Sequence, residues 1–258
     1  MKNDGQKELK IMSQNCMMLK GKLVFVMGGG NFGTRALKYL KAKRCKVLVA
    51  DINPYCMTKS EVTVQAADLN VTDSLVDGQA AFLVGDAVEL LLPLLETKVP
   101  DLVVTAIPGN AAAKVVESWL SKLGYKLEPY RTVIPRVLEN IPKSLVLFVD
   151  EDSAVIGVSY MPSHMQCREN CMPPKDCAST GRPKLTSMDK LLQFSVYNLI
   201  DTSTIFRSRQ LTGGLGAIDG KELHSLLKRL DNLNKPYTLA IGTACDCHGI
   251  LNLTKVKK

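Results

Sequence analysis

Residues 22–51 read KLVFVMGGGNFGTRALKYLKAKRCKVLVAD, and this stretch decides the fold. The apolar run at 22–27 ends in glycines, which is typical of a strand buried on both faces. Apolar residues then recur at helical spacing and predict a helix over residues 31–42. A second apolar run at 45–51 predicts another buried strand. The order strand, glycine turn, helix, strand indicates two parallel strands joined by a helical crossover.

The same alternation continues to about residue 150. Further strands are expected at 81–86, 101–108, 132–135 and 144–149. Helices are expected to start at Asp86 and at about residue 109. Pro93 should end or bend the first of these helices. Continuous apolar strands joined by helices predict a parallel sheet covered on both faces. The expected fold class is therefore α/β, with a doubly wound parallel Rossmann sheet over residues 21–150 that follows a flexible tail at 1–20.

After residue 150 the pattern predicts a second, smaller α/β domain over residues 151–258. Strands are expected at 155–160, 204–211 and 237–242, with helices at 188–198 and 219–233, the latter capped by Asp219. Between them, residues 161–186 hold four prolines and three cysteines. This domain is therefore expected to be organised around its cysteines.

Composition narrows the classes of partner. The chain has 258 residues, of which 46% are hydrophobic, so it can bury a core and is neither disordered nor collagen-like. A net charge of +8 favours an anionic small molecule, for which Arg207 and Arg209, placed on one strand face, are candidates with Arg182 and Lys184. Aromatic residues are only 5%, which argues against nucleic acid. The absence of a long apolar run predicts no membrane span and a cytoplasmic location with reduced thiols.

Three glycines at fixed spacing follow the first strand. Gly28, Gly30 and Gly33 form a G-x-G-x-x-G pattern, with Asn31 and Phe32 before the last glycine. Such a pattern lets the chain turn tightly, lets the backbone approach a pyrophosphate, and lets helix and strand pack closely. The helix N-terminus adds free N–H groups for phosphate. The pattern predicts a dinucleotide site; the alternatives are a flavin or S-adenosylmethionine in the same pocket, or a turn kept for packing alone.

Asp51, at the end of the second strand, is the candidate partner of the ribose. Its carboxylate can accept hydrogen bonds from a ribose diol and would repel a 2′-phosphate. NAD is therefore the expected cofactor and NADP the less favoured one, although Arg35, Lys43 and Arg44 lie nearby and weaken this preference.

Residues 22–123 resemble the nucleotide-binding domains of Trk-type potassium uptake proteins and regulators of potassium conductance. The matching features are the glycine turn, the acidic end of the second strand, a strand ending in Gly-Asp-Ala at 85–87, and a strand at 101–106 that leads to a loop over the nucleotide. The resemblance implies that Asp86 lies near the adenine side of the cleft and that Thr105 and Ala106 lie beside the nucleotide. It also implies a non-catalytic sensing role and an apolar surface for a homodimer.

A shorter stretch is similar to the dehydrogenase domain of siroheme synthesis. In that family a triple-glycine turn is followed by Arg-x-x-x-x-Leu, and here the turn is followed by Arg35 and Leu40. This similarity implies a dehydrogenase that acts on a tetrapyrrole.

Five of the eight cysteines fall in two short segments that hold Cys167, Cys171, Cys177, Cys245 and Cys247. His164 and His248 lie in the same segments. Several thiolates that converge bind zinc or an iron–sulfur cluster. We therefore predict that these cysteines ligate a metal, with an iron–sulfur cluster favoured over zinc. The alternative is a set of reduced thiols in a surface loop, or one disulfide.

Together these features predict an NAD(H)-binding redox protein with a Cys-ligated iron–sulfur or other metal site, and, if it is an enzyme, an NAD-dependent oxidoreductase. The two alternatives are a non-catalytic nucleotide- or redox-sensing regulator of the potassium-transport type and a siroheme-synthesis-like dehydrogenase. No Ser–His–Asp arrangement can be assigned, so the catalytic residues stay open.

Overall fold

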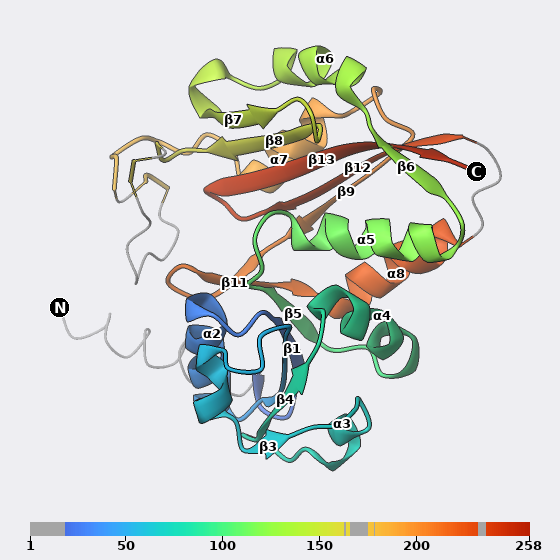
Figure 1. The fold of residues 1–258 in the computed structure, drawn as a ribbon. Helices are drawn as coiled ribbons and strands as arrows, with labels where there is room; N and C mark the ends of the chain where they lie inside the picture. Colours follow the sequence, from blue (N-terminus) through green and yellow to red (C-terminus); the bar gives the residue numbers. More distant parts are fainter. Residues whose placement is uncertain (1–18, 163, 166–174, 178, 232–235) are drawn as a thin grey trace. The chain divides into compact units, whose positions relative to one another are not determined.

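The computed structural model describes residues 19–162, 164–165, 175–177, 179–231 and 236–258 (Figure 1). The chain forms two compact units, which divide between Ala106 and Ile107. We call the part up to Ala106 unit 1 and the part from Ile107 onward unit 2. The boundary lies earlier than the position near residue 150 that the sequence predicts. The reason is that the strands between residues 107 and 150 pair with strands of the C-terminal half.

Unit 1 is built on parallel strands with helices between them. The strands are β1 (Leu23–Met27), β2 (Lys46–Asp51), β3 (Val64–Gln65), β4 (Ala80–Val84) and β5 (Leu102–Thr105), and the helical segments are α2 (Asn31–Ala42), η1 (Met57–Glu61), α3 (Val71–Ser74) and α4 (Ala87–Thr97). The strands lie in the order β5-β1-β2-β4-β3, and every pairing among them is parallel. Strand β1 is buried at every position, as its continuous apolar sequence predicts. Helices α2 and α4 pack against β1 and β2, and Figure 1 shows them on opposite sides of these strands.

Unit 2 is built on a mainly antiparallel six-stranded sheet. Its strands are β6 (Lys126–Pro129), β7 (Val146–Asp150), β8 (Val155–Ser159), β9 (Thr202–Arg207), β12 (Tyr237–Ala244) and β13 (His248–Lys257). The order is β7-β8-β13-β12-β9, with β6 pairing the far end of β13, and only β12 and β9 run parallel. A hairpin consists of β10 (Arg209–Thr212) and β11 (Leu215–Asp219), which pair antiparallel.

The helical segments of unit 2 are α5 (Ala111–Lys122), η2 (Arg131–Val133), α6 (Ile134–Glu139), η3 (Lys143–Leu145), α7 (Met188–Ser195) and α8 (Gly220–Leu230). One core joins α6 and α7 to β8, β12 and β13 through side chains such as Val137, Leu192 and Leu251. Asp219 caps α8, as predicted, because its carboxylate accepts hydrogen bonds from the N–H groups of Lys221 and Glu222.

Three local predictions are corrected by the structure. Residues 132–135 are helical and not a strand, because Pro135 lies in the first turn of α6, where its missing N–H costs nothing. The strand expected at 204–211 is divided at Ser208, whose N–H donates to the carbonyl of Ala244. Arg207 and Arg209 therefore belong to different strands and do not share one strand face. Helix α4 continues through Pro93 to Thr97, so this proline does not end the helix.

Within the described ranges, none of the helices combines the length and the apolar character needed to cross a bilayer.

Candidate functional site

The glycine turn of unit 1 has the geometry that its sequence predicts. Gly28 has a φ of +96°, a conformation that side chains other than glycine rarely adopt. A Cβ on Gly33 would lie 1.9 Å from the carbonyl oxygen of Gly28, so only glycine lets α2 approach the end of β1. A Cβ on Gly30 would meet no atom within 4 Å. The turn is therefore tight beneath Gly33 and open at Gly30, where a ligand could approach the backbone.

Asp51 is held against this turn by its two carboxylate oxygens. Oδ2 accepts a 2.6 Å hydrogen bond from the N–H of Gly29, and Oδ1 accepts a 2.8 Å hydrogen bond from the N–H of Asn53. The carbonyl of Gly29 in turn accepts from the N–H of Thr58, which is fully buried. The end of β2 and the segment after it thus fix the conformation of the turn. Each carboxylate oxygen keeps a second lone pair for a ligand hydroxyl.

The remaining residues expected at the nucleotide lie in different places. Asn31 and Phe32 begin α2, and the Phe32 side chain is 56% exposed. Thr105 ends β5 directly beside Met27 of β1. The N–H of Ala106 donates to the carbonyl of Met27, so both residues lie next to the glycine turn.

Asp86 has a structural partner that the resemblance does not imply. Its carboxylate caps α4 by accepting hydrogen bonds from the N–H groups of Val88 and Glu89. Its place near an adenine ring stays a prediction.

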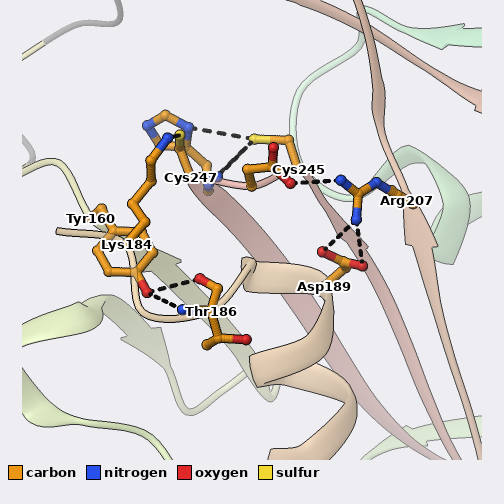
Figure 2. Close-up of polar contacts among 9 residues, drawn as sticks. Tyr160, Lys184, Thr186, Asp189, Arg207, Cys245 and Cys247 are labelled. Carbon is orange, nitrogen blue, oxygen red and sulfur yellow. Dashed lines mark hydrogen bonds and ion pairs between the residues drawn. The ribbon is translucent and has the colours of Figure 1, made fainter. Parts of the chain in front are cut away.

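A second candidate site lies in unit 2, where the turn between β12 and β13 carries Cys245, Asp246, Cys247 and His248 (Figure 2). The N–H of Cys245 donates to the carbonyl of His248 at 2.9 Å and closes the turn. The N–H groups of Cys247 and His248 both donate to the Sγ of Cys245 at 3.4 Å. The Nδ1 of His248 lies 3.8 Å from the same sulfur. Three polar groups of one short turn therefore surround the Cys245 thiol.

The two thiols of this turn have opposite electrostatic environments. A hydrogen bond from the Cys247 side chain holds the pKa of Cys245 well below its usual range, and the contacts from His248 act in the same direction. The same hydrogen bond to Cys245, together with burial, raises the pKa of Cys247. Negative charge is therefore favoured on Cys245 over Cys247.

Lys184 brings the proline-rich segment to this turn. Its Nζ donates to the Sγ of Cys247 at 3.3 Å. Two antiparallel backbone hydrogen bonds hold the segment that carries Lys184. The N–H of Lys184 donates to the carbonyl of Lys175, and the N–H of Cys177 donates to the carbonyl of Arg182. The charge of Lys184 acts on both Cys177 and Cys247. The two cysteine segments thus meet in space through their described members.

Arg207 ties the turn to helix α7. Its guanidinium contacts Asp246 at 2.7 Å and Asp189 at 3.2 Å (Figure 2). Asp189 is also one of the residues around an open hollow of about 410 Å³, which is lined by Asp189, Lys190, Gln193, Phe194, Tyr197 and Ile205. Arg207 thus has two carboxylate partners. They neutralise the positive charge of the guanidinium, which the sequence analysis proposed as a binding group for an anion.

The predicted metal centre is only partly described. Cys177, Cys245 and Cys247 belong to the described chain, whereas Cys167 and Cys171 lie outside it. Among the described residues, no group of three or more His, Cys, Asp or Glu side chains is placed to hold a metal ion. Ligation of zinc or an iron–sulfur cluster by the five cysteines therefore stays a prediction, and metal analysis of the purified protein tests it. His164 is among the described residues and belongs to no such group.

Sequence reasoning missed the residues that organise the second site. Asp189 and Asp246 have no local signal, because their shared partner Arg207 is 18 and 39 residues away along the chain. The sequence indicates Lys184 only as a basic residue that could bind an anion. Its pairing with Cys247, 63 residues later, comes from the fold of unit 2.

Comparisons with known proteins match both units. Residues 112–257 match the family model AF_1314_C, described as "Uncharacterized protein, C-terminal domain", and residues 23–108 match AF_1314_N, described as "Uncharacterized protein, N-terminal domain". A protein of Archaeoglobus fulgidus described as "Uncharacterized protein" is 28% identical over 231 residues, which cover 89% of this chain and 98% of that protein. No solved structure matches the chain significantly. The resemblances to potassium-regulator domains and to siroheme synthesis stay predictions.

Proposed function

The chain belongs to the AF_1314 family over both of its units, and for this family member we propose an NAD(H)-binding redox function. The observation that carries the proposal is the glycine turn of unit 1. It combines a backbone packed without space at Gly33, open space at Gly30, and a carboxylate at Asp51 that is bonded to the turn itself. These are the three features that a pyrophosphate and its ribose require.

The strand order supports the same proposal. The chain leaves β1 through α2 to reach β2 on one side, and it returns through α4 to β5 on the other side of β1. Open α/β sheets bind ligands where the strand order reverses in this way, outside the carboxyl ends of the strands. Here that position is flanked by Gly28 after β1 and by Thr105 at the end of β5. A Rossmann-type sheet is therefore the proposed finer description of unit 1.

The charge of the site favours NAD over NADP. Asp51 lies where the adenosine ribose would lie, and a carboxylate repels a 2′-phosphate. Helix α2 carries no acidic residue in its first turn, so its N-terminus is free to face the pyrophosphate.

Titration of the full chain with NAD, NADH and NADP by calorimetry tests the proposal. Gly30→Ala is the informative variant. Its φ of −75° suits alanine, and the added methyl enters open space, so folding should be unchanged. The methyl would occupy the space that a phosphate oxygen needs, so we expect NAD affinity to fall about tenfold or more, the loss of one charge-assisted hydrogen bond.

Two outcomes would contradict the proposal: wild-type protein that binds no NAD or NADH at millimolar concentration, or Gly30→Ala that binds NAD as tightly as the wild type. The thermal unfolding curve of Gly30→Ala serves as the control for folding.

A further inference from the structure

The turn at residues 245–248 directs its backbone donors at a sulfur atom. In an ordinary tight hairpin the closing N–H groups bond to a carbonyl oxygen. Here the N–H groups of Cys247 and His248 donate to the Sγ of Cys245 instead. Hydrogen bonds from N–H groups stabilise negative charge on the acceptor. The turn is therefore shaped to hold Cys245 as a thiolate.

A second thiol lies within reach of the first. The two cysteines are separated by one residue in the same turn, and the N–H of Cys247 itself donates to the Sγ of Cys245 at 3.4 Å. The Nζ of Lys184 donates to the Sγ of Cys247 at 3.3 Å (Figure 2). An ammonium group at this distance stabilises negative charge that develops on Cys247. Each thiol thus has its own set of donors.

The two thiols also differ in exposure. Cys245 is partly exposed, whereas Cys247 is buried with 8% of its surface accessible. An external disulfide can therefore reach the sulfur of Cys245, and Cys247 lies in the same turn, beside it. This is the division between an attacking and a resolving thiol that dithiol exchange requires.

We propose that Cys245 and Cys247 form a dithiol that exchanges with low-molecular-weight disulfides. The Cys245 thiolate attacks one sulfur of the disulfide, forms a mixed disulfide and releases the first small thiolate. Cys247 then attacks the Cys245 sulfur, the mixed disulfide breaks, and the second small thiolate leaves. The proton of Cys247 passes to a released thiolate. Two protein thiols are oxidised to one disulfide, and one small disulfide is reduced to two thiols.

This activity goes beyond NAD binding. All of its residues belong to unit 2, and its electrons pass between thiols and disulfides alone. A chain that binds no NAD could still carry out the exchange, so failure of one proposal leaves the other standing.

The test incubates reduced, full-length protein with glutathione disulfide and maps the tryptic peptides by mass spectrometry. Cys245 and Cys247 share one peptide that contains no other cysteine. We expect this peptide to lose two hydrogens as its bridge forms. Cys247→Ser should accumulate glutathione on Cys245, and Cys245→Ser should form neither product. Cys45→Ser serves as the control that should still form the bridge, because serine can keep the bond that the Cys45 thiol makes to the carbonyl of Leu19.

Lys184 is tested separately as a positioning residue. Lys184→Met should slow closure of the bridge about tenfold without changing the first attack on Cys245, and Lys184→Arg should restore the rate because it keeps a cationic donor. A purely structural role would give equal losses in both steps and no rescue.

Three results would overturn the proposal. The first is a reduced peptide that stays unchanged at saturating glutathione disulfide. The second is a bridge from Cys245 to Cys177, or a Cys245–Cys247 bridge that is lost in Cys177→Ser. The third is purified protein that holds stoichiometric zinc or iron, released only when Cys245 and Cys247 are alkylated.

Discussion

The carbonyl oxygen of Gly28 occupies the space that a side chain on Gly33 would need, since a Cβ there would lie 1.9 Å from that oxygen. No rotamer choice can relieve this overlap, because the backbone fixes the position of a Cβ and the other group is a backbone carbonyl. Close packing of α2 against the end of β1 is therefore the structural role of the third glycine, separate from any role in binding.

Gly33→Ala is expected to lower the free energy of unfolding by roughly 1–3 kcal/mol, the usual cost of forcing extra atoms into a packed site. Gly30→Ala should change it by less than about 0.5 kcal/mol, because its methyl enters open space at an allowed φ. Urea denaturation of both variants measures the difference. Equal stability of the two would contradict the packing role of Gly33.

Asp51→Asn should change cofactor preference. The single amide oxygen can keep the hydrogen bond from the N–H of Gly29 and gives up the one from the N–H of Asn53, so the turn should hold, but the negative charge is lost. We expect NAD affinity to fall about tenfold and NADP affinity to rise, since repulsion of the 2′-phosphate disappears. Calorimetric titration with both cofactors gives the ratio.

Asp101→Asn is the matched control for Asp51→Asn. Its carboxylate also accepts a backbone hydrogen bond, from the N–H of Leu23, but at the opposite, amino end of β1. The ratio of NAD to NADP affinity should be unchanged in this variant. A similar shift in both variants would mean that charge anywhere on unit 1 sets the preference.

Glu117 of helix α5 should make the free energy of unfolding of unit 2 depend on pH. Burial raises the pKa of Glu117, against the opposing effects of a hydrogen bond from Asn252 and the charge of Lys114. The folded state then holds the proton more tightly than the unfolded state, so stability is greatest at low pH and falls as pH rises from the ordinary carboxyl pKa through the raised one. Glu117→Gln removes this loss.

The stability difference between Glu117→Gln and wild type should therefore grow in favour of the variant as the pH rises above the ordinary carboxyl pKa of 4.5. Urea denaturation at a series of pH values measures it. Glu139→Gln, on the exposed face of α6, controls for the loss of one negative charge. A difference that shrinks with rising pH would show that the hydrogen bond from Asn252 outweighs burial.

The parts of the fold that the sequence predicts are those with a local cause. Strand β1, the glycine turn and helix α2 follow from apolar runs and fixed spacings within residues 22–42. Strand β6 has no such signal, because its pairing partner is the C-terminal end of β13, where Leu127 lies opposite Val256. The boundary between the units, which the sequence predicts near residue 150, falls after Ala106 for the same reason.

The two candidate sites differ in the same way: the first has a local cause in the sequence, and the second depends on residues far apart in the chain. The glycine spacing and Asp51 could be found in the sequence, because they lie on one continuous crossover. The cysteines could be noticed but not arranged. Their environment depends on Lys184 and Arg207, which reach the turn only after the sheet of unit 2 has formed. Spacing predicts a metal, which stays a prediction, and the described contacts show in addition that the thiols of Cys245 and Cys247 have different donors.

Cys245 should react with iodoacetamide at nearly constant rate between about pH 8 and about pH 6. The hydrogen bond from Cys247 holds the pKa of Cys245 well below that of an ordinary thiol, so the thiolate persists as pH falls. A cysteine with an ordinary pKa loses about tenfold in rate for each pH unit over this range. Mass spectrometry of the peptide shared by Cys245 and Cys247 follows the reaction. Cys247→Ala removes the hydrogen bond and should make the rate more dependent on pH, while a wild-type rate that falls in parallel with a model thiol would contradict the assignment of Cys245 as the thiolate.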